Sequence, residues 1–195
     1  LTALGADAYE IPTIAIEPPV NLLAFGESVQ DAHKFEWILF TSPNGVSAFF
    51  DLFFKIYKDA RELGAAKIAA IGPGTAKKLA EYRFAADFIP EVAVAESFVD
   101  EFIANAGSVE NSTVMWVRPE GARDVVSRAL VKAGAIIDEA IAYRTVPETR
   151  DIAGGQARFR EEGADVITFA SASAVDNFVA LNLPMPEDVK IASIG

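Results

Sequence analysis

The chain has 195 residues, of which 51% are hydrophobic and 23% charged, and its formal net charge is −11. This composition is sufficient for a packed core, whereas the acidic balance argues against a nucleic-acid surface, which needs clustered Lys and Arg. The sequence has no cysteine and one histidine, His33, which argues against disulfides, thiolate chemistry and a zinc cluster. No apolar run reaches the roughly 20 residues that cross a bilayer, so we expect a cytoplasmic protein without a nucleic-acid or membrane partner.

Short apolar runs rich in Ile, Val, Phe and Trp recur along the chain. They occupy residues 37–41, 67–71, 113–117, 138–143, 165–169 and 190–194. Such runs are typical of parallel strands that are covered on both faces. Between them lie helical patterns with apolar residues three and four positions apart, over 46–57 and 122–133. This alternation predicts an α/β protein with doubly wound parallel sheets.

Two distant segments of the chain are similar to each other. Residues 40–49 read FTSPNGVSAF and residues 169–178 read FASASAVDNF, an offset of 129 positions (169 minus 40) that places Ser42 on Ser171. The sequence IAAIG at 68–72 returns as IASIG at 191–195. We interpret the chain as a diverged duplication of one sheet-and-helix unit.

The repeat also predicts the domain boundaries. Segments 10–19 and 139–148 align within it, and both look extended and end near prolines. Each would leave one domain and enter the other, as the two strands of a hinge. We therefore expect a discontinuous end domain, 1–16 with 143–195, which is incomplete within these residues, and an inserted domain, 17–142.

The turns that follow the predicted strands carry hydroxyls, glycines and one arginine. Because the carboxyl ends of parallel strands meet at one edge of a sheet, where ligands bind in such folds, we expect these residues to contact a ligand. The simpler alternative at each turn is capping of the following helix. The candidates are Thr41, Ser42, Asn44, Gly72, Thr75, Arg118, Gly121, Ser171 and Ser173.

Three of the candidate positions have specific chemical alternatives. The segment GPGTAKKLA at 72–80 lacks both the P-loop and the dinucleotide fingerprint, which leaves an anion site at Thr75 or simple capping. Arg118 could bind a ligand carboxylate through its forked guanidinium, or pair with Glu120 or Asp124 nearby. Tyr143 ends an apolar strand, and its phenol could donate a proton to a leaving oxygen or serve only in packing.

The ordered set of segments resembles the uroporphyrinogen-III synthase family over essentially the whole chain. The segments are LGADAYEIPTIAI, WILFTSPNGVSAF, IAAIGPGTAKKL, AESF, MWVRPEGARDVVSRALVKAGAIIDEAIAYRTV, GADVITFASASAVDNF and IASIG. The resemblance implies two α/β domains joined by a two-stranded linker. It also implies a cofactor-free hydro-lyase of tetrapyrrole biosynthesis that cyclises hydroxymethylbilane, with loss of water and inversion of the last pyrrole ring.

The resemblance carries roles for individual residues as well. Tyr143 would assist loss of the substrate hydroxyl, and Ser42, Thr75 and Ser171 would face the ligand. The partner would be the linear tetrapyrrole, and a monomer is the expected state. The alternative from another class is a non-catalytic small-anion binding or regulatory module on the same scaffold. A nucleotide or flavin enzyme is disfavoured by the missing glycine fingerprints.

Overall fold

The computed structural model of the chain describes residues 2–91 and 95–193. It divides into two compact units, a discontinuous one formed by Leu1–Ile16 with Thr145–Gly195 and a continuous one formed by Glu17–Arg144. We call them the end unit and the inserted unit. The boundary predicted between 142 and 143 lies two residues before the observed one, so Tyr143 and Arg144 belong to the inserted unit.

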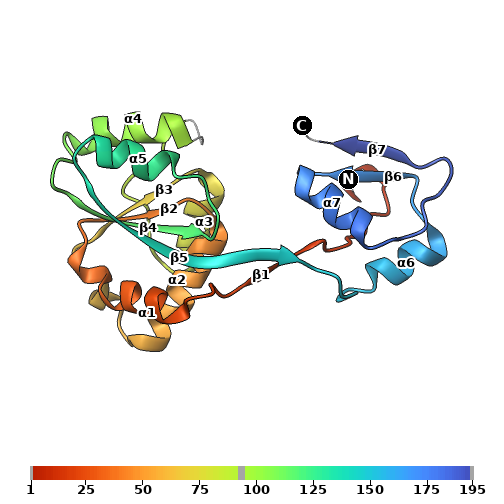
Figure 1. Ribbon diagram of the computed structural model, residues 1–195, viewed down its shortest axis with the longest axis horizontal. Helices are drawn as coiled ribbons and strands as arrows, with labels where there is room; N and C mark the ends of the chain where they lie inside the picture. The colour runs from red at the N-terminus through yellow and green to blue at the C-terminus, as the bar shows by residue number, and fades with distance from the viewer. Residues whose placement is uncertain (1, 92–94, 194–195) are drawn as a thin grey trace. The chain divides into compact units, whose positions relative to one another are not determined.

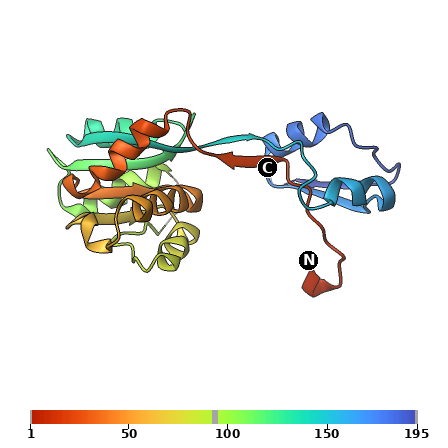
Figure 2. The ribbon, with the colours of Figure 1, turned by 90° about the horizontal axis from the view of Figure 1, so that it is seen from below.

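The inserted unit is built on a five-stranded sheet in the order β1-β5-β4-β2-β3, whose edge strand β1 and the end of β5 extend across the boundary between the units (Figure 1). Its strands are β1 (Ile14–Glu17), β2 (Trp37–Phe40), β3 (Lys67–Ala70), β4 (Thr113–Pro119) and β5 (Ile136–Pro147). The pairings β2 with β3, β2 with β4 and β4 with β5 are parallel. The edge strand β1 runs beside β5, as Figures 1 and 2 both show. The predicted parallel α/β class is confirmed.

Helices cover both faces of this sheet, with α4 and α5 on one side and α1 and α2 on the other (Figure 1). The helices are α1 (Leu22–Gln30), α2 (Pro43–Ile56), α3 (Pro73–Glu81), α4 (Ala95–Ala106) and α5 (Val125–Lys132), with short 3-10 turns at Ala32–Lys34 and Ala60–Leu63. Residues of α1, α2 and α3 share one core with Phe40, and residues of α4 and α5 share another with Trp116. Both layers are thus held by burial of apolar side chains.

Helix α2 shows how the sequence determines this packing. Ser42 caps it by accepting the Gly45 N–H, and Pro43 occupies the first turn, where a missing N–H costs nothing. The spaced phenylalanines Phe49, Phe50 and Phe53 are fully buried. Each such side chain contributes about 2–3 kcal/mol by leaving water.

Helix α5 begins later than the sequence pattern predicts. The apolar spacing includes Ala122, but the helix starts at Val125. Gly121 has a φ of +70°, a left-handed conformation that interrupts a helix, and the Ala122 carbonyl accepts a hydrogen bond from Arg118. Ala122 therefore lies in the loop between β4 and α5.

The end unit contains a two-stranded parallel sheet of β6 (Val166–Phe169) and β7 (Lys190–Ser193) with helices α6 (Gly155–Glu162) and α7 (Ala172–Ala180). A 3-10 turn, Thr2–Leu4, precedes them in the chain. Its core consists of Phe159, Phe169, Phe178 and Leu183. Ile194, the last residue of the strand predicted over 190–194, lies outside the described residues. Within the described part of the chain, no helix has the length and apolar character that a membrane crossing requires.

Candidate active site

A cavity of about 250 Å³ opens at the carboxyl edge of the sheet in the inserted unit. Its walls come from residues at the ends of β2, β3 and β4, from the start of α5, and from β5. They are Thr41, Ser42, Ile71, Trp116, Pro119, Ala122, Arg123, Val125, Val126 and Tyr143. The parallel order brings these strand ends together, as expected for a ligand site in an open α/β sheet.

Two hydroxyl groups meet in this cavity. The Ser42 Oγ lies 2.9 Å from the Tyr143 hydroxyl, and either oxygen can donate. The same Ser42 Oγ accepts the N–H of Gly45 at 3.1 Å, so the cap of α2 fixes its position. Tyr143 is 6% exposed, and its carbonyl accepts the N–H of Glu120 at 2.8 Å. Tyr143 is therefore held by hydrogen bonds at both its backbone carbonyl and its hydroxyl group.

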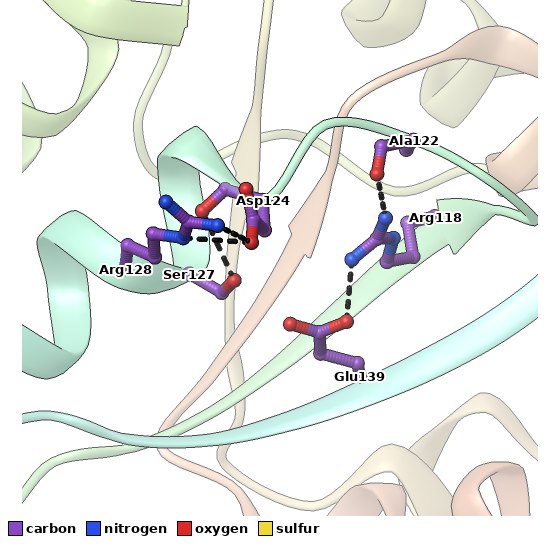
Figure 3. Close-up of polar contacts among 6 residues, drawn as sticks. All are labelled: Arg118, Ala122, Asp124, Ser127, Arg128 and Glu139. Atoms are coloured by element: carbon purple, nitrogen blue, oxygen red, sulfur yellow. Dashed lines mark hydrogen bonds and ion pairs between the residues drawn. The ribbon is translucent and has the colours of Figure 1, made fainter.

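The buried Arg118 side chain is held within the protein through its two terminal nitrogens (Figure 3), while its buried Nε has no hydrogen-bond partner among the described residues. Its guanidinium donates to the Glu139 carboxylate and to the Ala122 carbonyl, and it lies over the Trp116 ring, 4.4 Å from the ring centroid. The predicted alternative, a pair with Glu120 or Asp124, is wrong. Asp124 pairs instead with Arg128, 2.6 Å away on the next turn of α5.

The candidates at the start of α3 are part of the turn itself. Gly72 occupies the N-cap position with a φ of +85°, where a side chain would be strained. Thr75 is 2% exposed, and its hydroxyl donates to the Ile71 carbonyl at 3.0 Å. This bond closes on the preceding turn, so Thr75 does not cap the helix by accepting an N–H. Ile71, and neither Gly72 nor Thr75, lines the cavity.

The remaining candidates lie outside the cavity wall. Asn44 is exposed in the first turn of α2, and Gly121 is exposed in the loop after β4. Ser171 and Ser173 belong to the end unit, where both are exposed and their Oγ atoms are 3.1 Å apart. Ser171 caps α7 by accepting the Ala174 N–H at 3.2 Å. Of the predicted residues, the structure thus brings Thr41, Ser42 and Tyr143 together.

Sequence reasoning missed one charged residue of the site. Arg123 lines the cavity and is exposed, and it is the only charged side chain among the lining residues. The available signal was its place two residues after Gly121, in a loop that follows a predicted strand. The apolar spacing over 122–133 predicts a helix that includes Arg123. An arginine on the exposed face of a helix needs no function, so the pattern did not single it out.

The fold and this cavity define an α/β protein with a cavity at the carboxyl ends of parallel strands, where open α/β sheets usually bind small molecules. The family described as "Uroporphyrinogen-III synthase HemD" matches residues 1–195. The chain therefore belongs to the uroporphyrinogen-III synthase family.

Individual relatives agree with this assignment. The chain is 33% identical to the "Uroporphyrinogen-III synthase" of Synechococcus elongatus over 209 aligned positions, which cover 100% of the chain and 76% of that protein. A mutant uroporphyrinogen III synthase from Thermus thermophilus superposes with a TM-score of 0.63 at 16% identity, over 100% of this chain and 78% of that one. A uroporphyrinogen-III synthetase structure from Helicobacter pylori gives 0.63 at 18% identity, with coverage of 97% and 79%. At these identities, the two structures support the fold alone.

Proposed function

We propose that the chain catalyses the cyclisation of hydroxymethylbilane to uroporphyrinogen III, as a cofactor-free hydro-lyase. The family match over the whole chain supports this proposal, and the observation that carries it is the Ser42–Tyr143 hydroxyl pair in a cavity at the strand ends. The alternative of a non-catalytic binding module finds no support, because the matching relatives carry the synthase name.

The proposed role of Tyr143 is to assist departure of the substrate hydroxyl. The hydroxyl of a phenol can donate its proton to a leaving oxygen. The C–O bond breaks, the hydroxyl leaves as water with that proton, and the resulting phenolate recovers a proton from solvent. If Ser42 donates to the phenol oxygen, the Tyr143 proton is free for the substrate and the developing negative charge is stabilised.

Much of the catalytic task is positioning. The linear tetrapyrrole can lose its hydroxyl and close spontaneously to the uninverted isomer, so the protein must hold the reacting ends in the geometry that gives the inverted product. We propose that Thr41, Asn44, Gly72, Thr75 and Gly121 contact the ligand, directly or through their backbone groups. Ser171 and Ser173 would supply further hydroxyls from the end unit.

The proposal also includes the origin of the two units and the role of the strands that join them. We infer that the two units arose by duplication, because the β2–α2 and β6–α7 turns have the same capping geometry. The strands β1 and β5 cross between the units and would act as a two-stranded hinge. A monomer in the cytoplasm is the state that we propose.

Supplying hydroxymethylbilane to the purified protein and separating the product isomers tests the activity. We expect type III uroporphyrinogen to exceed the type I isomer that forms spontaneously. Boiled protein provides the control for the spontaneous reaction. A product mixture identical to that control, from protein that is folded by circular dichroism, would exclude the proposed function.

A further inference from the structure

The wall of the cavity presents a cation, Arg123, that has no partner among the described side chains. Arg123 is exposed in the loop before α5, and no hydrogen bond or ion pair joins it to residues 2–91 or 98–193. The arginines nearest to it in the sequence differ in this respect. Arg118 is bound to Glu139, and Arg128 is bound to Asp124. Arg123 thus retains its full capacity to donate hydrogen bonds.

The surroundings of Arg123 suit an anion. The cavity is also lined by Ser42 at the N-cap of α2 and by Val125 at the first turn of α5. Both helix starts carry the positive end of a helix dipole. At α2 the Ser42 Oγ accepts the Gly45 N–H, and at α5 the carboxylate of the N-cap residue Asp124 is paired with Arg128. The protein as a whole carries a charge of −11, so an anionic ligand would need such local donors to overcome the overall repulsion.

We propose that Arg123 is the arginine that pairs with a carboxylate of the ligand in this cavity, and that Arg118 is a positioning residue. This inference rests on the proposed function, in which the ligand is a tetrapyrrole that carries eight carboxylates. A planar guanidinium matches a carboxylate with two parallel hydrogen bonds. At a half-open rim, the pair selects and orients the ligand and does not take part in bond breaking.

In this proposal Arg118 does not contact the ligand and acts by positioning Arg123. Its guanidinium ties the Ala122 carbonyl, in the loop between β4 and α5, to Glu139 on β5 (Figure 3). Ala122 is the chain neighbour of Arg123, so this bond fixes the backbone from which the Arg123 side chain extends. The stack of Arg118 on Trp116 completes the support.

The experiment compares Arg123→Gln, in the loop before α5, with Arg128→Gln, which removes the same charge five positions later on α5. Arg128 does not line the cavity and pairs with Asp124. We expect Arg123→Gln to raise KM for hydroxymethylbilane roughly fivefold with little change in kcat, as an exposed charge-assisted contact would. Arg128→Gln should stay within about twofold of the parent. Equal KM values for the two variants would overturn the proposal.

A second readout separates this inference from the proposed function. Trp116 lines the cavity, so its fluorescence reports binding of uroporphyrin III, an octacarboxylate probe, without turnover. We expect weaker binding by Arg123→Gln than by Arg128→Gln, and a smaller loss of affinity on adding salt, because one ion pair is gone. Parent protein that binds the probe but forms no excess of type III product would refute the activity alone. Identical affinities for the probe in the parent and both variants would refute the role of Arg123.

The positioning role of Arg118 is tested separately. Glu139→Gln weakens the ion pair that holds Arg118, and we expect it to raise KM about twofold in the parent. In the Arg123→Gln background the same change should leave KM unaltered, because the positioned group is absent. A KM increase of the same size in both backgrounds would show that Arg118 has a structural role only.

Discussion

The β2–α2 turn of the inserted unit and the β6–α7 turn of the end unit have the same local structure. Ser42 and Ser171 are extended, with φ and ψ of −155° and 153° in the first and −160° and 157° in the second. Each accepts the N–H of the residue three positions on. The short polar side chain before a helix determines this conformation, and it does so in both units.

The two turns differ in what surrounds them. All four residues of β2 are buried between β3 and β4, whereas β6 pairs, among the described residues, with β7 alone and has two exposed residues, Val166 and Thr168. The Ser42 hydroxyl lies beside the Tyr143 phenol, whereas the side chain that the Ser171 hydroxyl contacts, among the described residues, is that of Ser173. Similar local sequence thus gives similar turns, while the neighbouring strands decide which turn acquires a chemically useful partner.

The largest expected effect concerns the burial of apolar side chains in the two units. Phe49 of α2 and Phe178 of α7 occupy equivalent places in the repeat, with 0% and 6% exposure. Phe49→Ala should lower the free energy of unfolding of the inserted unit by about 4 kcal/mol, because it leaves a cavity among Phe40, Phe50 and Phe53. Phe178→Ala should cost about 3 kcal/mol in the end unit.

Fluorescence and circular dichroism separate the two units. Both tryptophans of the chain, Trp37 and Trp116, lie in the inserted unit, so fluorescence reports that unit and circular dichroism reports both. Phe49→Ala should shift the fluorescence transition in denaturant, and Phe178→Ala should shift only part of the dichroism signal. A fluorescence shift of equal size in both variants would mean that the two units unfold together. Each phenylalanine would then not stabilise its own unit alone, contrary to this prediction.

The second prediction concerns Tyr143, the hydroxyl partner of Ser42 in the β2–α2 turn. Tyr143→Phe should slow formation of uroporphyrinogen III by roughly tenfold or more, in the range of general acids. Stability should fall by at most about 1 kcal/mol, since a single hydrogen bond to Ser42 is lost. Tyr82→Phe is the matched control, because it removes a phenol that donates to Asp51 away from the cavity. Parent turnover by Tyr143→Phe would remove the phenol from the mechanism.

These features were predictable from the sequence to different degrees. Short apolar runs determine the strands, and Ser42 before Pro43 determines the start of α2, because both are local effects. The partner of Arg118 was not predictable in this way. Glu139 is 21 residues away and becomes adjacent only because β4 and β5 pair in parallel, with Trp116 opposite Glu139. A periodic pattern does not report which strands are neighbours.

Arg123 was missed for a related reason. The apolar spacing from Ala122 onward fits a helix, and the loop exists because Gly121 is left-handed and Arg118 binds the Ala122 carbonyl. A tertiary contact thus overrides a local preference. Once the loop replaces the first helical turn, Arg123 lies on the cavity wall, a position that the helical pattern does not predict.

The third prediction compares the two capping serines. Ser42→Ala and Ser171→Ala should each cost about 1 kcal/mol of stability, because each leaves a helix N–H unpaired. Ser42→Ala should also lower kcat about threefold, since Tyr143 loses its hydroxyl partner. Asn21→Ala, which uncaps α1 far from the site in sequence and outside the cavity wall, controls for capping alone.

A double-mutant cycle decides whether Ser42 acts through Tyr143. In the Tyr143→Phe background, Ser42→Ala should lower kcat no further, because the hydroxyl that it positions is gone. An equal loss of kcat in both backgrounds would assign Ser42 an independent contact with the substrate.

The smallest expected effect concerns one acidic pair in each unit. In the end unit, hydrogen bonds from the Arg150 side chain and backbone lower the pKa of Glu148 to about 2. In the inserted unit, Arg61 lowers the pKa of Asp59 to about 2 in the same way. Both pKa values are depressed on folding, so each pair stabilises the protein above the ordinary carboxyl pKa, and this stabilisation is lost as the pH falls through about 2.

The two pairs differ in exposure, and salt should therefore distinguish them. The Glu148 side chain is 3% exposed and the Asp59 side chain 44%. Screening acts on exposed charges more than on buried ones, so 1 M salt (~3 Å Debye length) should raise the pKa of Asp59 toward its usual value more than that of Glu148. Carboxyl-carbon NMR titrations at low and high salt would measure both values in one sample. A larger rise at Glu148 would show that its carboxylate reaches solvent, contrary to the 3% exposure of its side chain.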